Sequence, residues 1–79
     1  MKELTLTAAE QERLNLPVNP RDTVKIIRER ETDGLLGAVL PVISVEPGFV
    51  DTIALGRVVR FRRDDVILHQ TLEELKKRR

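Results

Sequence analysis

The strongest constraint on the fold of this 79-residue chain is the alternation of arginine and apolar residues between positions 57 and 63. Successive side chains of a strand point to opposite faces, so Val59 and Phe61 share one face while Arg60 and Arg62 share the other. Four of these seven residues are arginine, although the formal net charge of the whole chain is only +1. The pattern predicts a two-sided β-ribbon with an apolar inner face and a guanidinium outer face, which suits a phosphate backbone.

The composition bounds the number of domains and the kinds of site. A chain of 79 residues forms a single small domain, 1–79, with a modest core. The absence of cysteine excludes disulfides and thiolate metal sites, and the single histidine cannot form a zinc site by itself. The longest apolar run, 34–45, is interrupted by Pro41 and is shorter than the ~20 residues of a membrane span. We expect a cytoplasmic protein with no membrane, metal or cofactor partner.

The charge is unevenly distributed along the chain. Residues 1–56 contain six Lys or Arg and nine Asp or Glu, whereas residues 57–79 contain eight and four. This asymmetry indicates one positively charged side of the molecule.

Two helix-start signals stand in the first third of the chain. The sequence Thr-Ala-Ala-Glu at 7–10 is a capping box, which predicts a helix over 8–14. Asn19 followed by proline predicts a second helix over 20–32, which ends at Gly34. This second helix would carry a basic stripe opposite its apolar side, although such a stripe by itself is more typical of a solvated face. The stripe consists of Arg21, Lys25 and Arg28.

An apolar insertion follows at about 34–48. Its spacing favours a helical turn up to Leu40, a strand over 42–45 and a turn at 46–48. We expect most of its large side chains to belong to the core of the domain. The alternative is a self-association surface, because so apolar a stretch would otherwise be exposed.

The last third of the chain predicts a hairpin and a helix. Strands over 49–55 and 57–62 pair about a glycine turn, with Ile53 on the same side as Val59. Aspartates at 64 and 65 then begin a last helix of about twelve residues. The leucines at 68, 72 and 75 share one face of that helix, and the basic residues 76–79 suit its negative end.

No catalytic constellation is visible in the sequence. It has no cysteine nucleophile, no glycine-rich phosphate loop and only one histidine. We therefore predict that the protein is not an enzyme.

The order helix, turn, helix, hairpin, helix resembles the excisionase-like branch of the winged helix-turn-helix proteins, which is related to the mercury-resistance-regulator type. The wing carries the resemblance, because this family has a segment of the form Gly-Arg-x-x-Arg-Phe-x-x-x-Asp-Val. The matching residues are Gly56-Arg57, Arg60-Phe61 and Asp65-Val66. Thr7 and Glu10 match the start of the first helix. The chain departs from the family by about a dozen extra residues between the second helix and the wing.

The resemblance implies an α+β fold, a small winged helix-turn-helix with a short β-hairpin wing and a C-terminal helix. It implies a non-catalytic DNA-binding protein of the excisionase or transcription-regulator type. The second helix would enter the major groove of double-stranded DNA, and the wing would lie on the backbone or the minor groove. The expected DNA-binding residues are Arg21, Lys25, Arg28, Arg57, Arg60, Arg62 and Arg63.

Further partners would be a second copy of the chain or a recombinase. A protein-interaction module is the alternative function. It would use the apolar segment 34–45 for association with itself or with a partner.

Overall fold

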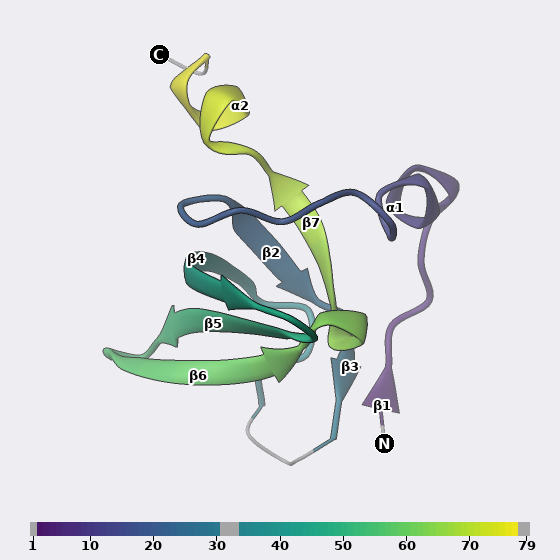
Figure 1. Cartoon of the computed structure of the whole chain (residues 1–79). Helices are drawn as coiled ribbons and strands as arrows, with labels where there is room; N and C mark the ends of the chain where they lie inside the picture. The colour runs from purple at the N-terminus through teal and green to yellow at the C-terminus, as the bar shows by residue number, and fades with distance from the viewer. Residues whose placement is uncertain (1, 31–33, 78–79) are drawn as a thin grey trace.

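The computed structural model describes residues 2–30 and 34–77, which are built mainly of β-strands (Figure 1). Five antiparallel strands form one sheet in the order β6-β5-β4-β2-β7. These strands are β2 (Thr23–Ile26), β4 (Val39–Glu46), β5 (Phe49–Ala54), β6 (Arg57–Arg62) and β7 (Val66–Gln70). The remaining elements are β1 (Lys2–Glu3) paired with β3 (Arg28–Glu29), the helices α1 (Ala8–Glu12) and α2 (Leu72–Lys76), and the 3₁₀ turn η1 (Arg63–Asp65). No helix in the described part of the chain is long and apolar enough to cross a membrane.

The predicted second helix is wrong. Its described part, 20–30, forms a loop followed by β2 and β3, and its last two residues lie outside the described part. Val24 and Ile26 are fully buried, while Lys25 between them faces the other side of the sheet. The backbone N–H and C=O groups of β2 form hydrogen bonds with β4 on one side and β7 on the other. In a helix the same groups would have bonded within the segment itself. The β-branched residues of this segment favour that outcome.

The predicted last helix is also wrong over most of its length. Residues 66–70 form β7, in which Val66, Ile67 and Leu68 are buried. A helix begins only after Thr71, whose hydroxyl accepts a hydrogen bond from the N–H of Glu74 at 3.1 Å. The three leucines of the predicted stripe are therefore divided between a strand and a short helix. With two short helices and a five-stranded antiparallel sheet, the fold is not a winged helix-turn-helix.

The predictions that rest on local chemistry are confirmed. The Thr7 hydroxyl accepts from the N–H of Glu10 at 3.1 Å, and the Thr7 N–H donates to the Glu10 carboxylate at 3.0 Å. This capping box starts α1, which is two residues shorter than expected. The turn at Pro47-Gly48 and the hairpin about Gly56 also form as predicted. The strand expected at 42–45 is present but begins earlier, at Val39, where a helical turn was expected.

The sheet is curled, as the short connection between its two edge strands requires. β6 and β7 stand at opposite edges of the sheet, yet only the three residues of η1 join them (Figure 1). In a flat sheet, four spacings would hold these strands about 19 Å apart. A three-residue 3₁₀ turn advances only about 6 Å. The two edges must therefore approach each other at this end.

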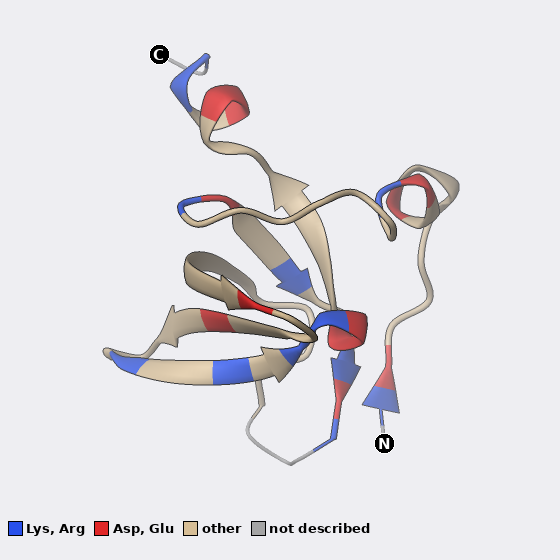
Figure 2. Cartoon of the chain, in the orientation of Figure 1, with Lys and Arg blue, Asp and Glu red and all other residues tan. Residues whose placement is uncertain are grey.

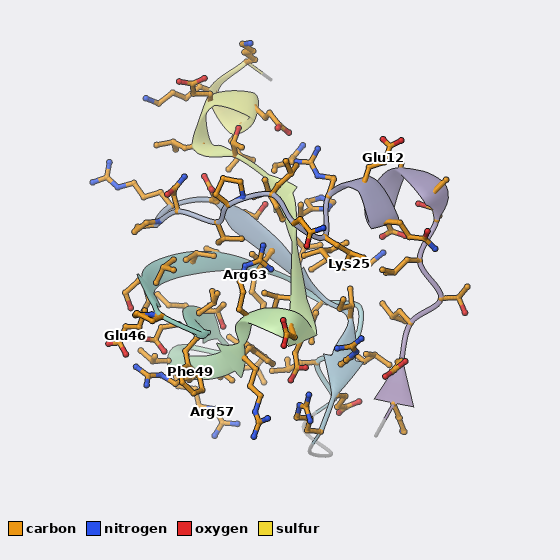
Figure 3. The ribbon with its side chains drawn as sticks, turned by 45° about the vertical axis from the view of Figure 1, so that its right-hand side comes forward. Glu12, Lys25, Glu46, Phe49, Arg57 and Arg63 are labelled. Atoms are coloured by element: carbon orange, nitrogen blue, oxygen red, sulfur yellow. The ribbon has the colours of Figure 1, made fainter. Side chains whose placement is uncertain are left out.

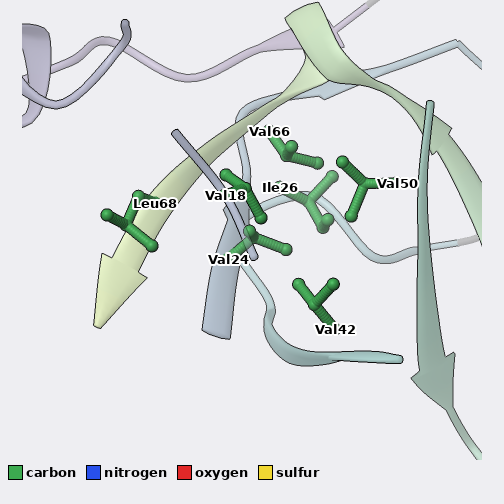
Figure 4. Packing of buried hydrophobic residues seen from close by; sticks show 7 residues of the cluster. All are labelled: Val18, Val24, Ile26, Val42, Val50, Val66 and Leu68. Carbon is green, nitrogen blue, oxygen red and sulfur yellow. The ribbon is translucent and has the colours of Figure 1, made fainter. Parts of the chain in front are cut away.

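The hydrophobic core lies inside this curl (Figure 4). It draws on four strands and on the loop between α1 and β2, and its members are Val18, Val24, Ile26, Val42, Val50, Val66 and Leu68. Phe61 and Leu40 pack against it from β6 and β4. We call the side of the sheet that faces this cluster the inner face, and the opposite side the outer face.

The hairpin β5–β6 shows which residues belong to which face. Val50 and Thr52 are fully buried, and Thr52 pairs with Val59 on the inner face. Ile53 pairs with Val58 on the outer face, so the prediction that Ile53 lies on the side of Val59 is wrong by one position. The prediction that Arg60 and Arg62 share the outer face is confirmed by their pairing with Asp51 and Phe49.

The apolar insertion is only partly core. Val42 is buried and Leu40 is half-buried, as expected. Val39 and Ile43 on the same strand remain 44% and 41% exposed. A break in the β4–β5 register between Val42 and Ser44 leaves Ile43 without a partner across the strands.

Candidate functional site

The seven predicted DNA-binding residues fall into two groups in the structure. Four of them have side-chain partners inside the chain, and these are Lys25, Arg28, Arg60 and Arg63. The other three make no ion pair or side-chain hydrogen bond with any described residue, and these are Arg21, Arg57 and Arg62. Lys25, Arg28 and Arg60 are paired with carboxylates of the chain, and Figure 2 shows acidic segments on the strands next to the basic ones.

Arg63 is a structural residue. Its guanidinium donates to the carbonyl of Leu16 at 2.6 Å and to that of Val66 at 3.0 Å, with a longer contact of 3.5 Å to the carbonyl of Leu14. These bonds tie η1 to the loop that follows α1, and Figure 3 shows the side chain directed into the molecule. Arg63 satisfies backbone acceptors that would otherwise lack a donor.

Arg60 forms the centre of a charged cluster on the outer face. Its guanidinium donates to Asp51 at 2.8 Å and 3.2 Å and to Glu46 at 3.1 Å. It also lies 5.3 Å from the centre of the Phe49 ring, which Figure 3 shows beside Glu46. Hydrogen bonds from Arg60, and then from the Ser44 hydroxyl, lower the pKa of Asp51, while the pairing raises the pKa of Arg60.

Lys25 holds α1 against the outer face of β2. Its ammonium group donates to the Glu10 carboxylate at 2.7 Å, and Figure 3 shows the side chain directed toward this helix. The hydrogen bond from Lys25, followed by that from the Thr7 N–H, lowers the pKa of Glu10 to about 2. The outer face of β2 is thus covered in part by the chain itself.

A cavity of about 530 Å³ lies along the free edge of β6, opposite β3 and η1. We call it the arginine groove. It is lined by Arg28, Glu29, Arg30, Phe49, Val59, Arg60, Phe61, Arg62 and Asp65. Its volume falls within the ~300–1,000 Å³ typical of ligand pockets. Of the seven residues predicted to bind DNA, the groove brings together only Arg28, Arg60 and Arg62.

One wall of the groove is fixed by an ion pair. The Arg30 guanidinium donates to both oxygens of Asp65, at 2.8 Å and 3.1 Å, and the Asp65 side chain is only 5% exposed. This contact raises the pKa of Arg30. Neighbouring Arg28 is held by Glu3 at 3.3 Å and by the carbonyl of Asp64 at 3.3 Å. Both arginines are therefore positioned by the chain before any ligand arrives.

A second candidate surface is an apolar group on and beside the outer face of β4, β5 and β6. We call it the outer patch. Its members are Val39 (44% exposed), Ile43 (41%), Ile53 (42%), Leu55 (88%) and Val58 (61%). In Figure 1, α1 and α2 lie toward β2 and β7, away from the β5–β6 hairpin.

Most of the outer patch was missed by the sequence analysis. Val39 and Ile43 were expected to be core, and Ile53 was placed on the wrong face. The signal that could have placed Ile53 is its spacing from Asp51, because residues two apart in a strand share a face and a carboxylate on the inner face of so small a core would be unfavourable. Asp51 therefore indicates that Ile53 lies on the outer face.

The fold and these two surfaces define a small domain made of a curled antiparallel sheet. Among residues 2–30 and 34–77 there is no group of three or more His, Cys, Asp or Glu that could hold a metal ion. The chain matches no protein-family model, no curated protein and no solved structure.

Proposed function

We propose that this protein is a non-enzymatic interaction module that self-associates through the outer patch. The observation that carries the proposal is the exposure of five large apolar side chains on adjoining strands and their turn. Ile53 and Val58 are cross-strand neighbours next to Leu55, and exposed large apolar side chains that gather in this way are typical of interfaces. Burying one such side chain contributes roughly 1.5–3 kcal/mol, so their joint burial is a substantial driving force.

Leu55 gives independent support. It is 88% exposed and has a φ of +52°, a left-handed conformation that L-residues with a bulky side chain rarely adopt. It occupies the first position of a two-residue hairpin turn with Gly56, where asparagine or glycine suits the backbone better. Leucine is therefore unfavourable at this position for two reasons: its side chain disfavours the left-handed backbone, and its apolar surface is exposed to water. Residues kept in such conformations cluster at functional contacts.

The charges around the outer patch favour a second copy as the occupant. Lys25 is paired with Glu10 on one side, and Arg60 is paired with Asp51 and Glu46 on the other. A face whose charges are already balanced can meet its own image about a two-fold axis without opposing unpaired like charges. Arg57 and Arg62 have no ion pair with a described residue, but Arg57 faces the side of the buried Ala54 and Arg62 lies at the end of β6 that is far from the turn.

Binding to double-stranded DNA stays a prediction, with weaker support. The described part of the helix that was to enter the major groove, 20–30, forms a loop and two strands, and four of the seven expected contacts are held within the chain. If the three free arginines all contacted phosphates, the slope of log K against log salt would be about −2.7. A titration with random duplex DNA across a salt series measures that slope.

Sedimentation velocity over a concentration series tests the proposal. We expect the natural protein to show a dimer that dissociates on dilution. Val58→Asp should abolish the dimer and leave the circular dichroism spectrum unchanged, because this side chain is 61% exposed. Leu14→Asp is the control, since Leu14 is 37% exposed but lies outside the outer patch. A natural protein that stays monomeric at millimolar concentration, or an equal effect of both substitutions, would contradict the proposal.

A further inference from the structure

The free edge of β6 presents backbone groups in a defined order. The two-residue turn makes Ala54 and Arg57 a hydrogen-bonded pair, and such pairs alternate along an antiparallel ladder. The backbone groups of Val59 therefore face β5, where its carbonyl also accepts from the Thr52 hydroxyl at 3.0 Å. Those of Val58 and Arg60 face away from β5. They make no hydrogen bond with any other residue in the described part of the chain.

The arginine groove lies along this edge and contains one arginine without an ion pair. Four arginines and two carboxylates line it, and three of these arginines are paired with carboxylates of the chain. Arg62 is the one lining arginine without an ion pair to a described residue. Its charge is therefore available to an incoming anionic group, and Arg28 and Arg30 stand on the opposite wall.

We propose that the arginine groove binds an extended acidic peptide segment, which adds to the sheet as a strand beside β6. The peptide backbone would pair with the N–H and C=O groups of Val58 and Arg60. Carboxylates at alternate positions of the peptide would meet Arg62. This site uses backbone groups on the edge of β6, whereas the proposed self-association uses side chains of the outer patch, and the two surfaces share only Val58.

The edge distinguishes a peptide from a nucleic acid. The free carbonyls of Val58 and Arg60 require hydrogen-bond donors, which a phosphodiester backbone lacks and a peptide strand supplies at every second residue. The hydrogen-bond donors of a nucleic acid lie on its bases and, in RNA, on the 2′-hydroxyl, and they do not repeat along the backbone at the spacing of these strand carbonyls.

The edge also disfavours a second copy. If two β6 strands paired with their outer faces on the same side, the arginines of one copy would lie beside those of the other. Charged side chains on an exposed edge strand are a known means of preventing such pairing. An acidic segment turns the same charges into attraction.

The test is a fluorescence-anisotropy titration with a labelled peptide of four Glu-Val repeats, blocked at both ends. We expect binding that weakens with salt and is weakened about tenfold or more by Arg62→Glu. Arg57→Glu is the matched control, because Arg57 lies on the same strand without an ion pair but does not line the groove. It should change the dissociation constant less than about threefold, through long-range charge alone.

Amide hydrogen exchange supplies the readout for strand addition. The amides of Val58 and Arg60 should become protected when the peptide binds, and a Glu-Pro repeat of equal charge should bind weakly and protect neither. Peptide binding without this protection, an equal effect of the two arginine substitutions, or tighter binding of an oligothymidine of equal charge would each overturn the proposal. Because Val58 belongs to both surfaces, the titration and the exchange experiment are made at a protein concentration at which sedimentation shows only monomer.

Discussion

The two faces of β5 differ in both the size and the burial of their side chains. On the inner face Val50 and Thr52 are fully buried, and Ala54 is 5% exposed. On the outer face Phe49 and Ile53 are 40% and 42% exposed, although they are larger and at least as apolar. One six-residue strand therefore contributes small residues to the core and large ones to the surface.

This difference shows what the curl of the sheet does. A curled sheet encloses a narrow space, which side chains as small as valine, threonine and alanine can fill. A chain as short as this one therefore supplies enough residues for the core. The outer face diverges, and α1 covers only the part over β2. The inner face therefore determines the stability of the fold, while the outer face is available for contacts with other molecules.

The largest expected effect separates the two faces directly. Ile26→Ala, at a fully buried position, should lower the free energy of unfolding by about 2–5 kcal/mol. Ile53→Ala removes the same atoms at a position that is 42% exposed and should change it by less than about 1 kcal/mol in the monomer. Chemical denaturation of dilute protein measures both. Similar losses would mean that the outer face is packed as tightly as the inner one.

The next effect concerns two adjacent arginines. Arg63→Ala should lower the free energy of unfolding by about 1–3 kcal/mol, because it removes the donors to the carbonyls of Leu16 and Val66. Arg62→Ala should change it by about 0.5 kcal/mol or less, since Arg62 has no side-chain partner among the described residues. Thermal unfolding of the two variants side by side makes the comparison. A larger loss of stability for Arg62→Ala than for Arg63→Ala would show that Arg62, and not Arg63, is the arginine that holds the fold together.

Leu55→Asn should have a smaller effect of the opposite sign. Asparagine tolerates the left-handed backbone at a φ of +52°, so the monomer should gain about 1 kcal/mol. The same change should weaken self-association, because it removes the most exposed member of the outer patch. Denaturation at low concentration and sedimentation at high concentration measure the two parts. A monomer that loses stability would show that Leu55 packs within its own chain.

The smallest effect concerns the covered part of the outer face. The folded state lowers the pKa of Glu10 from its ordinary 4.5 to about 2, so its ionised form contributes stability above pH 4.5. That contribution is lost as the pH falls through this interval. Glu10→Gln should flatten the decline in stability between these pH values, and Glu12→Gln on the same helix should leave it unchanged. Urea denaturation at several acidic pH values measures this, and identical curves for both variants would exclude the Lys25 contact in solution.

The sequence predicted those parts of the structure that local chemistry determines. The capping box at Thr7, the turn at Gly48 and the hairpin at Gly56 each depend on residues within four positions of one another. The alternation in β6 correctly assigned the faces of Arg60 and Arg62. These signals need no knowledge of the distant chain.

The parts that failed depend on distant partners. The spacing of apolar residues around Val24, after Asn19-Pro20, predicts an amphipathic helix. In the structure this segment instead pairs with two strands, β4 and β7. Asn19 and Asp22, which were expected to start a helix, belong to the loop before β2. There the Asp22 carboxylate accepts a hydrogen bond from the N–H of Asn19 at 2.9 Å. The number of basic residues available to DNA was overestimated for the same reason. Glu46 and Asp51 contact Arg60 only because β4, β5 and β6 are paired in the sheet.

The order of the strands also has a consequence for the time course of folding. The hairpins β4–β5 and β5–β6 join neighbouring residues and can form within about 1–10 μs. β2 instead receives one of its two partners from the far end of the chain, where Val24 pairs with Leu68. A nascent chain on the ribosome therefore cannot close its core until β7 has emerged, and Val24 and Ile26 stay accessible to chaperones in the meantime. In pulse-labelled hydrogen exchange, the amides of β5 should become protected before those of β2.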